Sequence, residues 1–231
     1  MQKKLLIVAL LMGIALTGTA RATLIDRGGG LIYDSDINIT WLSDATYAKT
    51  SGYDADGRMN WSDANTWAAN LSYGGYDDWR LPTTLQPDSS CDGQYDAGVP
   101  YGMQGYGYNC TGSEMGHLFY SELGIQAGQP AENPNIPELN LFQNIVFDAA
   151  FWSGTENAPN TIHAWLFDFY NGRQYYDLKD GNLYAWAVRS GDVAATNGTV
   201  PEPQTLALLG LGLAGLALAR RRGSFFRASC S

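Results

Sequence analysis

The chain has 231 residues, of which 45% are hydrophobic and 16% charged, and its net charge at pH 7 is −9. Between residues 23 and 199 the imbalance is larger, with seven Lys and Arg against 22 Asp and Glu, a net charge of −15. Such an acidic surface repels phosphates and anionic lipids, which excludes a nucleic-acid partner. It attracts cations, calcium included, although acidity also serves solubility alone.

The N-terminus has the organisation of a secretory signal peptide. Lys3 and Lys4 form a positive start, and the segment Leu5–Leu16 is mostly apolar. Ala20-Arg21-Ala22 then has the small-x-small form of a cleavage site. We therefore expect residues 1–22 to be removed on export, leaving Thr23 as the first residue. A retained N-terminal anchor is the alternative.

The first exported elements are short strands followed by a helix. Residues 31–33 and 37–41 are rich in β-branched and aromatic side chains, and Asp34-Ser35-Asp36 between them predicts a turn. Apolar residues at helical spacing from Trp61 to Leu71 predict a helix, with Asn60 as its N-cap.

The middle of the chain predicts one more strand and a second helix. A strand carrying Trp79 and Leu81 is expected to stop at Pro82, because proline cannot donate to a sheet. The run Thr111-Gly-Ser-Glu114 fits a capping box, and Gly124 is placed to end the helix that it opens.

The last third of the chain has the alternation of β-strands. Aromatic residues alternate with smaller ones over 165–169 and again over 184–188. Asn171-Gly172 and Asp180-Gly181 are dipeptides typical of hairpin turns. Taken together, these elements predict an α+β domain with two helices and antiparallel strands.

A long Gly- and Tyr-rich loop lies between the two predicted helices, over residues 89–110. It contains Cys91 and Cys110, and export permits a disulfide between them. Closing this loop would add about 3 kcal/mol in the chain-entropy model. Metal ligation by the two cysteines is disfavoured, because neither belongs to a CxxC pair and the chain has two histidines.

The same loop carries two sets of candidate binding residues. Calcium takes six to eight oxygen ligands, and carboxylates spaced four apart are present at Asp88, Asp92 and Asp96. Tyrosine rings stack on sugar faces while their hydroxyls form hydrogen bonds. Tyrosines suited to this are Tyr95, Tyr101, Tyr106 and Tyr108. A flexible loop of low complexity explains the same composition equally well.

The C-terminus combines a short apolar run with an arginine cluster. The run Leu206–Ala219 has 14 residues, roughly 21 Å as a helix, against a hydrocarbon core of about 30 Å. Clustered arginines stay on the cytoplasmic side of a membrane, which places the body on the other side. The prolines before the run hold the chain extended. The residues of this signal are Val200, Pro201, Glu202, Pro203, Arg220, Arg221 and Arg222.

This tail resembles the PEP-CTERM sorting signal of Gram-negative bacteria over residues 200–222. The resemblance implies recognition by an exosortase, with transient inner-membrane association through residues 206–219. Release or transfer to the cell envelope or extracellular matrix would follow. Residues 223–231 would be a cytoplasmic tail. An ordinary C-terminal anchor is the alternative.

The body resembles the Lcl C-terminal domain family over residues 23–192, leaving 193–199 as a linker. The segment DWRLPT at 78–83 is the most specific motif, and CTGSEMGHLFYSELG, FWSGTE and YAWAVR follow it in the expected order. The resemblance implies a C-type-lectin-like fold: two helices flanking a small twisted, mostly antiparallel sheet, with a long disulfide-closed loop. We expect Arg80 to pair with a carboxylate. The expected core residues are Trp79, Leu81, Trp152, Trp165 and Trp186.

Three functions remain open from the sequence. The first is a non-catalytic binding module for polysaccharide or another surface polymer. Some family members bind sulfated glycans, but a charge of −15 favours a neutral or calcium-bridged ligand here. The second is a purely structural matrix component. The third is a cysteine-dependent enzyme, which would need Cys91 and Cys110 as thiols and His117 or His163 as a base.

Overall fold

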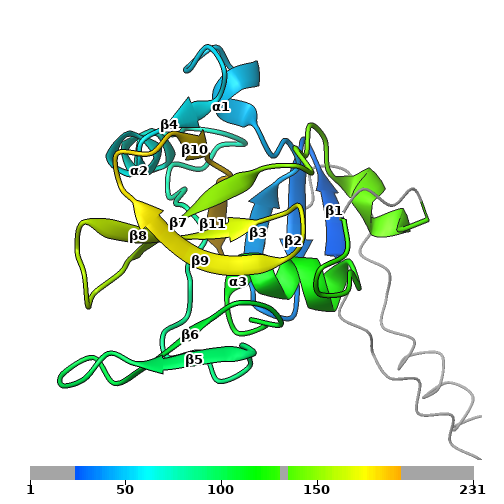
Figure 1. The fold of residues 1–231 in the computed structure, drawn as a ribbon. Helices are drawn as coiled ribbons and strands as arrows, with labels where there is room; N and C mark the ends of the chain where they lie inside the picture. Colours follow the sequence, from blue (N-terminus) through cyan, green and yellow to red (C-terminus); the bar gives the residue numbers. More distant parts are fainter. Residues whose placement is uncertain (1–23, 131–134, 194–231) are drawn as a thin grey trace, which may run out of the picture.

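The computed structural model describes residues 24–130 and 135–193 of the chain (Figure 1). Several predicted segments lie outside the described residues. They are the signal peptide (1–22), the sorting signal (200–222), the tail (223–231) and all but the first residue of the linker (193–199). Within the described ranges, no helix has both the length and the apolar character needed to cross a bilayer.

The first sheet is antiparallel and has the strand order β1-β2-β3-β11. It joins the two ends of the domain, because the last strand pairs with β3 near the start. The turn after β2 forms as expected, with the Asp34 side chain accepting a hydrogen bond from the Asp36 N–H at 3.1 Å. The strands are β1 (Leu24–Gly28), β2 (Leu31–Asp34), β3 (Ile39–Leu42) and β11 (Val188–Ser190).

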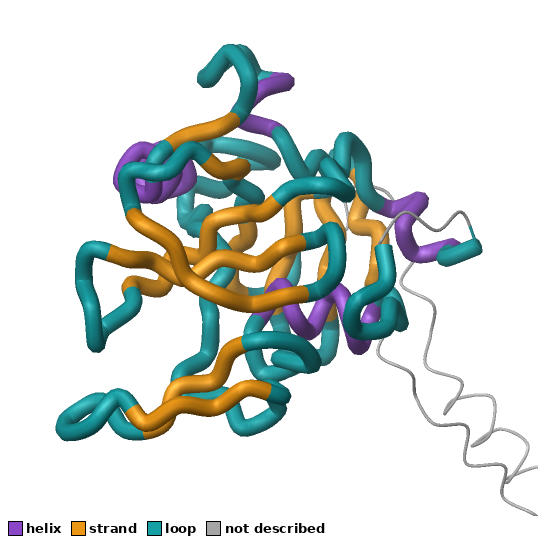
Figure 2. Tube along the Cα trace, in the orientation of Figure 1, coloured by secondary structure: helices purple, strands orange, loops and turns teal. Residues whose placement is uncertain are grey.

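The second sheet has five strands in the order β4-β10-β7-β8-β9 (Figure 2). Only the pair β10 and β7 is parallel. The predicted hairpin at Asn171-Gly172 joins β8 to β9, and Gly172 has the positive φ of +82° that the turn needs. The strands are β4 (Arg58–Met59), β10 (Leu183–Tyr184), β7 (Ala150–Glu156), β8 (His163–Asp168) and β9 (Arg173–Leu178).

A third, two-stranded sheet lies within the segment that the sequence predicted as a loop. Its strands are β5 (Gly93–Asp96) and β6 (Met103–Tyr106). Both strands carry exposed side chains and are joined by a turn around Gly98. The sequence therefore has no hydrophobic alternation here that would have predicted them. The long loop is therefore a hairpin that projects from the body, as Figure 1 shows.

The helices are short. As predicted, Asn60 caps α2, accepting the Asp63 N–H at 3.0 Å. The second predicted helix has only three α-helical residues and continues as a π-helix. Its N-cap is Ser113, and the expected capping box is absent because Glu114 pairs with Arg80 instead. The helical segments are α1 (Tyr47–Thr50), α2 (Trp61–Ala69), α3 (Glu114–Gly116), the π-helix η1 (His117–Glu122) and the 3₁₀-helix η2 (Pro137–Leu141).

The expected fold class, α+β and C-type-lectin-like with two helices flanking one small sheet, is wrong for this structure. Of the described residues 16% are helical and 32% lie in strands, with three short α-helices and several sheets. The difference has two local causes. The π-helix leaves little of the second α-helix, and the predicted loop contributes two more strands.

Two strand predictions are also wrong. The segment around Trp79 and Leu81 forms only an isolated bridge, in which Arg80 and Val188 exchange two backbone hydrogen bonds of 2.8 Å. The turn at Asp180-Gly181 does not close a hairpin. The chain beyond it divides between two sheets, with β10 in the second and β11 in the first.

The core is dominated by aromatic side chains. The five residues expected there, Trp79, Leu81, Trp152, Trp165 and Trp186, are all buried. Trp186 contacts Trp41 and Phe142 edge-to-face, each at a ring-centroid distance of 5.2 Å. Its indole N–H donates to the carbonyl of Leu42 at 2.7 Å, so the ring is buried without losing a hydrogen bond.

Candidate functional site

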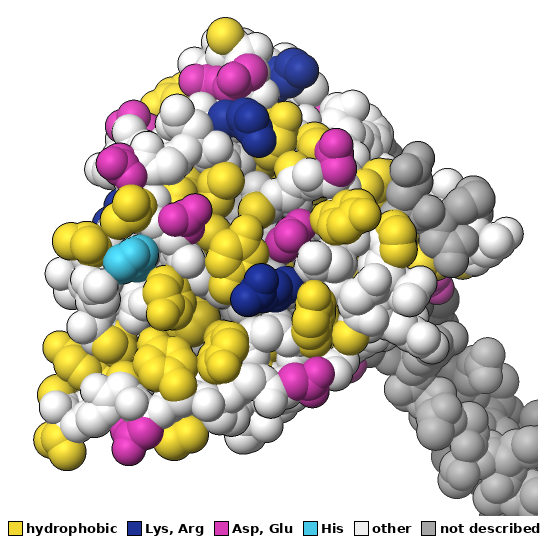
Figure 3. Space-filling model, viewed as in Figure 1, with side chains coloured by type: hydrophobic (Ala, Val, Ile, Leu, Met, Phe, Trp, Pro, Cys, Tyr) yellow, Lys and Arg dark blue, Asp and Glu magenta, His cyan; other side chains and the backbone are white. Residues whose placement is uncertain are grey.

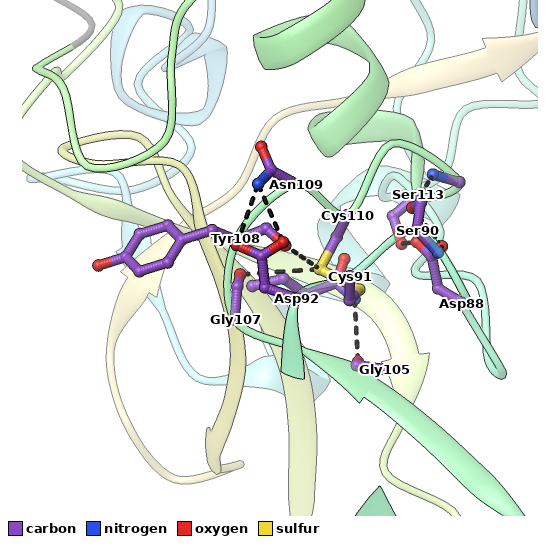
Figure 4. Close-up of a disulfide and its surroundings, with 12 residues drawn as sticks. Asp88, Ser90, Cys91, Asp92, Gly105, Gly107, Tyr108, Asn109, Cys110 and Ser113 are labelled. Atoms are coloured by element: carbon purple, nitrogen blue, oxygen red, sulfur yellow. Dashed lines mark hydrogen bonds between the residues drawn. A yellow bond between two sulfur atoms is a disulfide. The ribbon is translucent and has the colours of Figure 1, made fainter. Parts of the chain in front are cut away.

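The projecting segment, residues 85–110, is called the arm below. The expected disulfide between Cys91 and Cys110 closes its base (Figure 4). Beside it, the Asp92 N–H donates to the carbonyl of Tyr108 at 2.9 Å. The disulfide therefore holds the two ends of the β5–β6 hairpin together where the arm meets the body.

Glutamine amides, rather than apolar packing, hold the rest of the arm. The Gln86 side chain accepts from the Gly105 N–H and donates to the Gly105 carbonyl, each at 2.7 Å. Gln94 donates to the carbonyl of Asp88 at 2.7 Å. Gly107 and Gln174 exchange backbone hydrogen bonds of 2.8 and 2.7 Å, which fastens the arm to β9. These contacts place β6 beside the edge of the second sheet.

Aromatic side chains gather where the arm meets β8 and β9. Tyr95 and Tyr106 contact each other edge-to-face at 5.9 Å. Tyr176 lies 5.4 Å from both His163 and Trp165, measured between ring centroids. Figure 3 shows hydrophobic side chains gathered over this part of the molecule. We call these five residues the aromatic face. Two of them are well exposed, Tyr106 at 37% and Tyr176 at 39%.

The aromatic face also contains unused hydrogen-bonding capacity. Nε1 of Trp165, Nδ1 of His163 and Oδ1 of Asn157 are buried and have no hydrogen-bond partner. The Asn157 side chain interacts with Tyr95, whose pKa is raised, first by burial and then by the nearby Tyr176. Buried polar atoms are normally paired. Three unpaired polar atoms in one region are therefore unusual, but they are buried, so the part of this face that is open to a ligand is the exposed rings.

The structure brings together only part of the predicted tyrosine set. Tyr95 and Tyr106 share the aromatic face, whereas Tyr101 is exposed in the turn between β5 and β6. Tyr108 lies in the neighbourhood of Tyr120 instead. Sequence reasoning missed Tyr176, which β9 supplies from a distant part of the chain. The sequence of β9, RQYYDL, has no apolar alternation that would have pointed to this tyrosine.

The structure does not bring together the three carboxylates of the calcium hypothesis. Each has its own local partner: Asp88 accepts from the Ser90 N–H at 3.0 Å, and Asp96 from the Gly98 N–H at 2.8 Å. Asp92 accepts from the side chain of Asn109 (Figure 4). Among the described residues, the groups close enough to share one ion do not include this set. Calcium binding by the chain stays a prediction, which a titration of the purified chain with calcium would test.

Two open pockets lie away from the aromatic face. They have volumes of about 460 and 390 Å³ and share Ile145 and Val146 in their walls. Tyr184 lines the first and Tyr170 the second. Neither contains a residue of the aromatic face, which is therefore an outer surface rather than the lining of these pockets.

The expected partner of Arg80 is Glu114. The Arg80 guanidinium donates two hydrogen bonds of 2.7 Å, one to each carboxylate oxygen of Glu114. The same carboxylate accepts a hydrogen bond from the Thr83 N–H at 2.7 Å. The arginine of the DWRLPT segment thus fixes the start of the helical segment, which is a structural role.

Comparison with known families identifies two regions of the chain. The Lcl C-terminal domain profile matches residues 30–189, more than half of the chain. The chain belongs to the Lcl C-terminal domain family. The PEP-CTERM protein-sorting motif matches residues 199–222. No curated protein matches the chain. The sorting motif marks this Lcl-family chain as exported to the cell envelope and processed by an exosortase.

Proposed function

We propose that this Lcl-family domain is a non-catalytic module that binds polysaccharide or another surface polymer through the aromatic face. The observation that carries the proposal is the pair of exposed rings, Tyr106 and Tyr176, on a face that the arm shares with β8 and β9. Aromatic rings stack on the apolar faces of sugars, and nearby donors and acceptors orient the hydroxyls.

The shape of the face favours a polymer over a small molecule. The aromatic face spans two elements, the arm and the β8–β9 hairpin, and lies outside the two pockets described above. An extended chain can contact such a surface at several points, while a small molecule would bury too little of its own surface. The net charge of −15 between residues 23 and 199 favours a neutral polymer over a sulfated one.

The disulfide supports the non-catalytic assignment. A cysteine nucleophile acts as a thiolate, and Cys91 and Cys110 are bonded to each other. A purely structural matrix component without a ligand is the remaining alternative, and binding measurements distinguish it from a binding module.

The proposed path to the envelope uses both ends of the chain. After export, residues 206–219 would hold the chain briefly in the inner membrane, with the domain outside, until the exosortase acts. A pulse–chase experiment in producing cells should find the longer form in the membrane first and a shorter form outside later. A stable, uncut membrane form as the end product would contradict this path.

The test of the binding proposal is a glycan array carrying neutral and sulfated polysaccharides, probed with the purified full-length chain. Removing both exposed rings, in Tyr106→Ala with Tyr176→Ala, should lower binding about thirtyfold, since each ring contributes about 1 kcal/mol. Tyr53→Ala is the matched control, because Tyr53 is 57% exposed and follows α1, on the opposite side of the molecule from the arm (Figure 1). Absence of binding to every polymer on the array would favour the structural alternative.

A further inference from the structure

Three ionisable side chains form a buried cluster away from the arm. Nε2 of His117 lies 3.2 Å from Oε1 of Glu122 and 3.7 Å from Oδ2 of Asp34. The Asp34 side chain is fully buried, that of Glu122 is 3% exposed and that of His117 is 12% exposed. Each residue directs one ligand atom into a space in which all three atoms lie within 4.8 Å of one another.

The π-helix η1 brings His117 and Glu122 to the same side. Residues five apart lie about 140° apart around an α-helix of 3.6 residues per turn. A π-helix is closed by bonds between residues five apart, which stacks such residues one above the other. The bond from the Leu123 N–H to the carbonyl of Leu118, at 2.9 Å, has this spacing. Single π-helical turns inside helices occur frequently at functional sites.

Asp34 is held so that one oxygen faces the histidine. Oδ1 accepts the backbone N–H groups of Asp36 and Ile37, at 3.1 and 3.4 Å, in the turn after β2. Oδ2 is buried and has no hydrogen-bond partner. An unpaired buried carboxylate oxygen is costly, and its position beside His117 indicates that something else completes its environment.

The electrostatics of the cluster favour a bound cation. Burial raises the pKa of Asp34 and of Glu122, and the charge of Asp34 raises the pKa of Glu122 further. The nearby His117 opposes both shifts. Two buried carboxylates beside one another are costly to hold ionised without a compensating charge. A cation of charge +2 would remove that cost and keep both carboxylates ionised.

We propose that Asp34, His117 and Glu122 bind a divalent transition-metal ion, for which zinc is the probe. The donor set of one imidazole nitrogen and two carboxylate oxygens is one that zinc accepts, whereas calcium prefers oxygen ligands alone. Ligand atoms about 2.1 Å from a tetrahedral zinc lie roughly 3.4 Å apart. The two separations from His117, 3.2 and 3.7 Å, are close to that value.

The proposed ion would connect two parts of the fold. Asp34 ends β2 of the first sheet, while His117 and Glu122 belong to η1, which packs near the ends of these strands (Figure 1). A metal held by both would lock the helical segment onto the sheet. The ion would stabilise the folded chain by an amount that increases with the free metal concentration.

The test uses the purified full-length chain, treated with a chelator and then titrated with zinc, calorimetrically and by thermal unfolding. One zinc per chain should bind, and a hundredfold excess over the dissociation constant should raise Tm by about 5 °C or more. Lowering the pH should weaken binding, because zinc must then displace protons from its ligands.

The two histidines of the chain provide a matched pair of variants. His117→Gln should weaken zinc binding by at least tenfold, while His163→Gln should leave it unchanged. Asp34→Asn and the exposed Asp36→Asn form a second pair. Asp34→Asn should weaken binding far more, because Asp36 contributes a nearby charge but no ligand atom. This pair tests the proposal if His117→Gln fails to fold. No zinc binding by the unmodified chain, or equal losses within both pairs, would overturn the proposal.

Discussion

The arm and the core achieve order by different means. The core buries large aromatic rings, such as Trp41 and Phe167, that are 0 to 1% exposed and contact one another closely. The arm buries little apolar surface. The residues of β5 alternate between partly exposed and exposed, and only the two central residues of β6 are buried. The buried positions of the arm are mostly cysteine, glutamine, aspartate and glycine. A disulfide and glutamine amides replace the apolar packing there. Stability in this domain therefore has two sources, and the aromatic face depends on both: the arm supplies Tyr95 and Tyr106, while β8 and β9 supply the other three residues.

The largest effect is expected in the core. Trp186→Ala removes a fully buried ring that contacts Trp41 and Phe142 and donates to Leu42. The free energy of unfolding should fall by about 4 kcal/mol, since truncating buried Trp or Phe costs 3–5 kcal/mol. Denaturant unfolding of the full-length chain measures the change. The partly exposed Trp61 is the control, and an equal loss in Trp61→Ala would contradict the core's dominance.

Removing the disulfide should affect mainly the arm. The combined change Cys91→Ala and Cys110→Ala opens a bridge that spans 19 positions, at a cost of about 3 kcal/mol in the chain-entropy model. Hydrogen exchange should become faster at the amides of β5 and β6, while β3 and β8 stay protected.

The same variant tests whether the arm supports binding. Tyr95 and Tyr106 would lose their fixed position against Tyr176, so polymer binding should fall while the core remains folded. Equal loss of protection in β5 and β3 would show that the arm and the core unfold as one unit. That result would contradict a separate stabilisation of the two regions.

The smallest effect is expected at the ion pair between Arg80 and Glu114, which lie on either side of the arm in the sequence. Arg80→Lys loses the two-pronged pairing with Glu114, which a single ammonium group cannot reproduce. Because the Arg80 side chain is 33% exposed, we expect a loss of only about 1 kcal/mol. Arg58→Lys serves as control, since Arg58 only stacks over the ring of Tyr184. A larger loss in the control would contradict the role of Arg80 in fixing the start of the helical segment.

Much of the local structure followed from the sequence. The N-cap of Asn60, the turn at Asp34 and the hairpin at Asn171-Gly172 depend on residues within a few positions of one another, so their signals are complete in a short stretch. Burial of the tryptophans followed from their size and apolar character. The disulfide followed from two exported cysteines that had no metal-site pattern.

The sequence by itself therefore determined the short-range features, the pairing of the cysteines and the sorting of the chain, because each depends on chemistry contained in one segment or one pair. Only the tertiary structure decided which segments meet. It directed Glu114 to Arg80 instead of to a cap, divided β10 and β11 between two sheets, and brought Tyr95 beside Tyr176. Which strands pair, and where a helix begins, depends on the summed packing of distant segments, so no local pattern specifies either.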